Sequence, residues 1–135
     1  EAKKGTEAVF YEPVMAVVGL SPTVPAERTK IGKILGRCSE ISNEEEKLKF
    51  TLAAYNAGIG HVYDAQRLAR KYGKDPTKWD GNVDEFIRKK SDPIYYNDSI
   101  CKHGYLRGSE TFKYVSDVLT RFNYYKKNTD RIYFL

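Results

Sequence analysis

An apolar run with helical spacing ends abruptly at two glycines near the middle of the chain. Residues 51–60 read Thr-Leu-Ala-Ala-Tyr-Asn-Ala-Gly-Ile-Gly. Glycine just past a helix end adopts left-handed backbone without steric cost, so Gly58 and Gly60 predict a helix stop here. This stop leaves the phenol of Tyr55 and the carboxamide of Asn56 at the helix end. Both groups can hydrogen-bond a polar ligand.

The segment before this stop carries its own helix signals. Ser42 and Glu45 match a capping box, and Leu48, Leu52 and Tyr55 then fall on one helix face. We therefore expect a helix that begins at Ser42 and buries that face.

The remaining segments also favour helices, and no alternating strand pattern competes with them. Further helices are expected over residues 27–38, over 59–72 with Gly73 as terminator, after a cap at Asn82, and from about Ser109 onward. Pro13 interrupts the apolar segment 6–19, and loops are expected at 20–26 and 94–108. At 135 residues, the sequence predicts a single all-α domain spanning 1–135.

Composition restricts the partners of this domain. The net charge of +5 favours an anionic partner such as nucleic acid, an acidic membrane or the carboxylated bacterial wall, or simply reflects a basic solvated surface. The chain has no dense polybasic tail, which argues against nucleic acid. The 11 tyrosines offer flat apolar faces with polar tips, which suit sugars and polar clefts. No apolar run is long enough to cross a membrane.

The two cysteines leave two alternatives open. Cys38 and Cys101 could pair in an oxidising compartment or remain buried thiols. Their spacing does not suit a metal site, and His61 and His103 do not complete one, so neither metal nor cofactor is expected. The chain begins Glu-Ala-Lys-Lys without a signal-peptide core, and we expect it to be a portion of something longer.

Three ordered motifs lie between residues 48 and 125. They are Ala54-Tyr55-Asn56-Ala57-Gly58, then Gly60-His61-Val62-Tyr63-Asp64-Ala65 with Trp79 downstream, then Gly104-Tyr105-Leu106-Arg107-Gly108-Ser109-Glu110-Thr111 with Tyr114. These motifs resemble the lytic transglycosylases, lysozyme-like enzymes that cut bacterial peptidoglycan, and are similar to the membrane-bound branch whose catalytic domain is C-terminal.

The resemblance implies a lysozyme-like fold, with or without its N-terminal part, a peptidoglycan glycan strand as partner and a periplasmic or envelope location. We expect a monomer that binds no nucleic acid.

The resemblance also implies a set of substrate-binding residues. The tyrosine matching Tyr55 reaches the catalytic glutamate or the substrate, and the asparagine matching Asn56 shapes the cleft. The residues matching Glu110 and Tyr114 close the other wall, and Tyr105 could supply a flat apolar face for a sugar.

Each of these residues also has a purely structural alternative. Tyr55 could be only a core residue, and Asn56 only a helix C-terminal turn residue. Glu110 could be a first-turn partner of the helix dipole, and Arg107 could simply pair with Glu110 or Asp117.

The family's catalytic glutamate has no clear counterpart in this sequence. In the family it protonates the glycosidic oxygen and then acts as base on the sugar's own 6-hydroxyl, giving a 1,6-anhydro product. Such a carboxyl needs a pKa raised by an apolar setting, and Glu12 sits among apolar residues. However, Pro13 follows it instead of serine, and its spacing to Tyr55 is too short. The alternatives are an acid that lies before Glu1, or a domain that binds glycan or is structural without cutting.

Overall fold

The computed structural model describes residues 25–38 and 40–134, which form helices and loops and contain no β-strand. The prediction of an all-α domain is confirmed for this part of the chain. The segment 6–19, and Glu12 with it, lies outside the described residues. The elements are α2 (Pro25–Arg37), α3 (Glu44–Ala57), α4 (Ile59–Lys71), η1 (Trp79–Val83), α5 (Asp84–Lys89), α6 (Pro93–Tyr96) and α7 (Gly108–Phe134).

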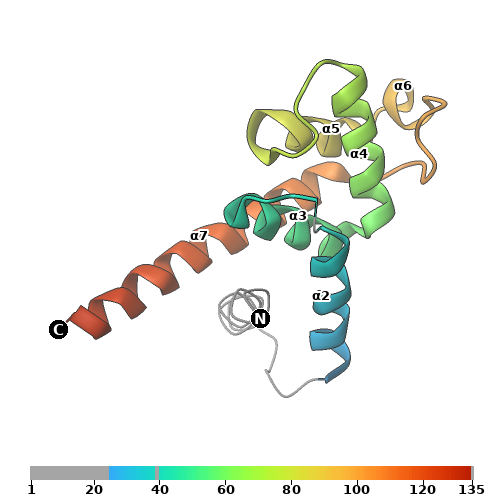
Figure 1. Ribbon diagram of the computed structural model, residues 1–135. Helices are drawn as coiled ribbons and strands as arrows, with labels where there is room; N and C mark the ends of the chain where they lie inside the picture. The colour runs from blue at the N-terminus through green and yellow to red at the C-terminus, as the bar shows by residue number, and fades with distance from the viewer. Residues whose placement is uncertain (1–24, 39, 135) are drawn as a thin grey trace.

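The helices pack around α3. Figure 1 shows α3 alongside the first half of the long helix α7, with α4, α5 and α6 gathered at one end and α2 below. Direct contacts join α3 to α7, α4 and α2, and join α5 to α7. The second half of α7 extends away from the other labelled helices. No described helix is both long enough and apolar enough to span a bilayer.

One apolar core connects these helices. The rings of Phe50 in α3 and Trp79 in η1 meet edge to face with centroids 5.6 Å apart, and both are buried. Packing of large side chains in a closed core is the main stabilising contribution in such a domain. The other large members that are fully buried are Leu52, Val62, Leu68, Val83, Phe86, Ile87, Val115 and Val118.

The start of α3 differs from the sequence prediction. Asn43, not Ser42, is the N-cap, and its side-chain oxygen accepts a hydrogen bond from the Glu46 amide at 3.0 Å. Asparagine caps at least as well as serine, so the adjacent residue takes the position. The predicted capping box of Ser42 with Glu45 is therefore wrong, although the helix itself is confirmed.

The predicted stop after α3 is confirmed at one of the two glycines. Gly58 has φ +101° and its amide donates to the Ala54 carbonyl at 2.8 Å. Gly60 instead lies inside α4, and a Cβ there would come within 2.6 Å of the His103 ring. Gly60 therefore permits the close approach of a loop and does not end a helix.

Three further boundaries depart from the sequence prediction. Asn82 does not cap α5; its side-chain oxygen accepts from the Asp75 amide at 3.0 Å and so closes the preceding loop. Residues 25 and 26 of the predicted loop at 20–26 are helical, because Pro25 already starts α2, where proline fits the first turn. The predicted loop at 94–108 contains the short helix α6, capped by Asp92.

The start of α7 is fixed by a close contact with α5. Gly108 begins the helix, and a Cβ at this position would overlap the carbonyl of Ile87. Only glycine permits this approach, which brings the first turns of α7 beside α5 and the end of α3.

Candidate functional site

A hydrogen bond joins the end of α3 to the start of α7. The Thr111 hydroxyl donates to the side-chain oxygen of Asn56 at 2.9 Å, and Thr111 is buried. Tyr55 precedes Asn56 on α3, while Glu110 and Tyr114 flank Thr111 on α7. The fold thus brings the predicted Tyr55, Asn56, Glu110 and Tyr114 to one corner between two helices.

The two tyrosines of this corner are half-buried. Both pack against the apolar core, and the Lys30 ammonium of α2 lies 5.0 Å from the centroid of the Tyr55 ring. Burial raises the pKa of the Tyr114 phenol. Each tyrosine therefore combines an apolar contact with partial exposure, an arrangement that suits contact with a sugar.

Glu110 occupies an exposed position at this corner. Its carboxylate pairs with the Arg107 guanidinium at 3.0 Å, which confirms the expected ion pair. Two-thirds of each of these side chains is exposed (66% and 68%), so the pair adds little to stability. A general acid at neutral pH needs an apolar setting, and the surroundings of Glu110 suit contact with hydroxyl groups instead.

Tyr105 lies in the loop that leads into α7. It is exposed and meets Tyr96 of α6 edge to face, with centroids 5.9 Å apart. The neighbouring Tyr95 packs instead against both Tyr72 and Phe86, whose rings stack on each other. Of these two adjacent tyrosines, Tyr95 therefore packs toward the core and Tyr96 contacts Tyr105.

A buried carboxylate fixes the loop that carries Tyr105. Asp64 of α4 is fully buried and accepts from the Lys90 ammonium at 2.6 Å and the Arg67 guanidinium at 2.6 Å. It also accepts from the backbone amides of Lys102 and His103, both at 2.9 Å.

These contacts determine the ionisation of Asp64. Burial alone would raise the pKa of its carboxyl, but the hydrogen bonds from Lys90, Lys102 and Arg67 outweigh burial and lower the pKa to about 2. The loop is held at two more points: the Leu106 amide donates to the Lys90 carbonyl at 3.1 Å, and Arg67 Nε to the Ile100 carbonyl at 3.0 Å.

Sequence reasoning missed this network. The signal available was an acidic residue, Asp64, within the apolar stripe of a predicted helix, but no spacing identified its partners. Lys90 lies 26 positions away and Lys102 lies 38 positions away.

The thiols and carboxyls of the described residues offer little chemistry. Cys38 and Cys101 are free thiols in the structure, and burial raises the pKa of each. Burial raises the pKa of the Asp84 carboxyl, which lies in the first turn of α5. The described residues contain no cluster of ligands that could hold a metal ion.

The helical architecture and the corner between α3 and α7 define an all-α, lysozyme-like domain. The chain is 45% identical over 73 residues to "Membrane-bound lytic murein transglycosylase F" of Maricaulis maris, a match covering 54% of this chain and 15% of that protein. Proteins of the same name match at 35% over 97 residues in Desulfosudis oleivorans and 33% over 116 residues in Shewanella frigidimarina.

These two matches cover 72% and 82% of the present chain but only 21% and 24% of the relatives. The chain therefore belongs to the lytic transglycosylase family and spans about a fifth of the length of these curated relatives. No protein-family model matches it.

Proposed function

We propose that this chain binds the glycan strand of bacterial murein at the corner between α3 and α7. The observation that carries the proposal is the Thr111–Asn56 hydrogen bond, which joins two motifs that are 55 positions apart in the chain. The names of the relatives, membrane-bound lytic murein transglycosylases, support murein as the ligand and the cell envelope as the location.

In this proposal Tyr55 and Tyr114 present ring edges and hydroxyl groups to the sugar, and Glu110 accepts hydrogen bonds from sugar hydroxyls. The carboxamide oxygen of Asn56 accepts the hydrogen bond from Thr111, so the amide N–H groups of Asn56 are the ones that would donate to a ligand. Tyr105, fixed by the Asp64 network, adds an exposed aromatic face.

Binding is tested by sedimentation of the 135-residue chain with purified insoluble murein. Tyr55→Phe removes one hydroxyl while keeping the ring, and we expect about fivefold weaker binding, the equivalent of one hydrogen bond of about 1 kcal/mol. The matched control is Tyr124→Phe, an exposed tyrosine farther along α7, which should bind as the unmodified chain does. Equal binding by both variants would remove Tyr55 from the site.

We further propose that, where a catalytic glutamate is present, cleavage is non-hydrolytic and breaks the MurNAc–GlcNAc bond to give a 1,6-anhydro sugar; Glu12 is the weak candidate for this acid within the present chain. Mass spectrometry of soluble products after incubation with murein tests this. Glu12→Gln should abolish anhydro products and preserve sedimentation with murein, whereas Glu7→Gln serves as the matched control. If anhydro products persist in Glu12→Gln, another residue is the acid.

A second candidate is a structural domain of the same fold that does not bind glycan. The observation that favours it is the packing of Tyr55 and Tyr114 against the apolar core. This candidate predicts neither anhydro products nor sedimentation of the unmodified chain with murein.

A further inference from the structure

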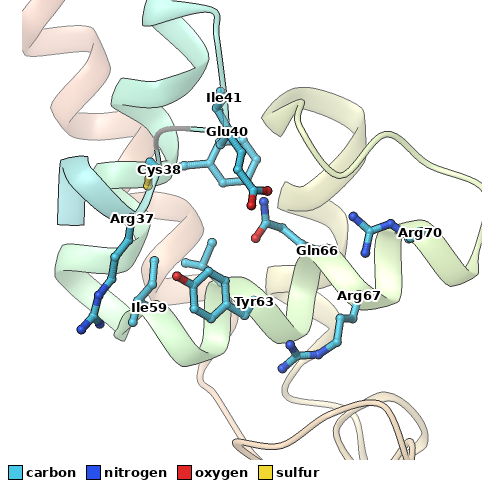
Figure 2. A pocket seen from close by; sticks show the side chains of 11 residues that line it. Arg37, Cys38, Glu40, Ile41, Ile59, Tyr63, Gln66, Arg67 and Arg70 are labelled. Carbon is cyan, nitrogen blue, oxygen red and sulfur yellow. The ribbon is translucent and has the colours of Figure 1, made fainter. Parts of the chain in front are cut away.

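A concave site lies between the end of α2 and α4. It is a pocket of about 330 Å³, shown in Figure 2. Its walls come from the chain segment after α2, from α3 and from successive turns of α4. The lining residues are Arg37, Cys38, Glu40, Ile41, Phe50, Ile59, Val62, Tyr63, Gln66, Arg67 and Arg70.

This pocket shares no residue with the proposed glycan corner. Tyr55, Asn56, Glu110 and Tyr114 do not line it, and its nearest wall on α4 starts at Ile59, just past the helix stop. A ligand could therefore occupy the pocket whether or not the α3–α7 corner is filled.

The lining carries an excess of positive charge. Three arginines and a single carboxylate, that of Glu40, line the pocket. Arg37 and Arg70 are exposed and form no ion pair within the described part of the chain. Arg67 is held in place by Asp64 and the Ile100 carbonyl. Because Asp64 also neutralises Lys90, its charge does not cancel that of the three arginines.

The floor of the pocket is apolar. Ile41, Phe50 and Val62 are buried beneath it, and Ile59 borders it. Between the arginines lie the Tyr63 ring and Gln66, whose amide nitrogen donates to the Pro76 carbonyl at 3.0 Å. Its side-chain oxygen is thus available as an acceptor. Figure 2 shows Arg37 on one side of the pocket and Arg70 on the other, with Tyr63 and Gln66 between them.

The pocket is suited to binding more than to covalent chemistry. Its one nucleophile, Cys38, is buried, and burial raises the pKa of this thiol and keeps it protonated. A planar guanidinium group pairs with a carboxylate through charge and parallel hydrogen bonds, and an apolar floor can contact a short aliphatic chain.

We propose that this pocket binds a short aliphatic dicarboxylate, with one carboxylate at Arg37, the other at Arg70, and Ile41, Phe50 and Val62 beneath the aliphatic part. Two sources share this chemistry: a C-terminal glutamate of a peptide and a free short-chain diacid. Binding should weaken as salt rises, because both arginines are exposed.

The proposal is tested by following backbone amide resonances of the 135-residue chain by NMR. The probes are N-acetyl-alanyl-glutamate, its uncharged dicarboxamide and glutarate. We expect the carboxylate peptide to shift amides over residues 59–70 and the dicarboxamide to shift none. Arg37→Gln and Arg70→Gln should each weaken binding by about three- to tenfold. Lys113→Gln, an exposed charge on α7, is the matched control and should leave binding unchanged.

The outcomes separate clearly. Glutarate binding as tightly as the peptide supports the pocket with a free acid as its ligand, and preference for the peptide supports a peptide source. Equal affinity for the charged peptide and its dicarboxamide overturns the proposal. So does unchanged binding in both arginine variants.

Discussion

Asn56 and Thr111 are 55 positions apart, yet their side chains share one hydrogen bond at the α3–α7 corner. Thr111 is buried, so its hydroxyl depends on a protein partner, whereas the exposed Asn56 can turn to water. Loss of Asn56 therefore leaves a buried donor without its partner, and such a loss costs more than the hydrogen bond itself.

This asymmetry gives a stability prediction for single residues. Asn56→Ala should lower the free energy of unfolding by about 1–2 kcal/mol, measured by urea denaturation. Adding Thr111→Val should cause little further loss, because both polar partners are then absent. Fully additive losses in the double variant would show that the two side chains act independently.

Single residues also show where sequence reasoning succeeds. The stop at Gly58 follows from local backbone chemistry and could be predicted from the sequence. The role of Gly60 could not, because it depends on the ring of His103, which approaches from a distant loop. Asn43 was missed for a smaller reason: two adjacent residues could both cap the helix, and only the backbone geometry distinguishes them.

At the scale of elements, the loop between α6 and α7 is ordered by a charge network and not by secondary structure. The side chains of Asp64 and Lys90 are both completely buried, with 0% of each exposed, and they form an ion pair inside the protein. Helix positions could be predicted from local periodicity. The position of this loop could not, because it depends on contacts between α4, α5 and residues 100–106 that no local pattern encodes.

Removal of one charge from this network should be costly. Asp64→Asn leaves the Lys90 ammonium buried beside a neutral amide, and we expect a loss of about 3–5 kcal/mol in unfolding free energy. The matched control is Glu85→Gln, which breaks the partly exposed Glu85–Lys89 pair within α5 and should cost at most about 0.5 kcal/mol. Denaturant unfolding of both variants measures the difference. Similar small losses would contradict a structural role for the Asp64 charge.

At the scale of the whole molecule, the two proposed sites share no residue but both involve the helices on either side of the α3–α4 turn. The proposed glycan corner includes the end of α3, and the arginine-lined pocket includes residues of α4. Both surfaces depend on α4 being fixed, because α4 carries Asp64 on its buried side and the pocket residues on its outer side. A change of charge inside the protein should therefore be detected at both surfaces.

Acid unfolding tests this dependence for the whole domain. The pKa of the Asp64 carboxyl is about 2 in the folded protein and near its ordinary value of 3.8 in the unfolded chain. The unfolded state thus binds more protons between these values, and folding stability falls as pH drops from about 4 to about 2. The contribution lost through this one group is about 2 kcal/mol.

We expect the unfolding free energy of the unmodified chain to decline steeply below pH 4. Circular dichroism during denaturation at each pH measures this free energy. In Asp64→Asn the decline should be shallower by about 2 kcal/mol, since the group that titrates in this range is gone. Glu85→Gln should reduce the slope far less, because the Glu85 carboxyl is partly exposed and its pKa is lowered mainly by the hydrogen bond from Lys89. Parallel pH profiles for Asp64→Asn and the unmodified chain would mean that the Asp64 carboxyl has the same pKa in the folded and the unfolded protein, which would contradict a net stabilisation of its charge by Lys90 and Arg67.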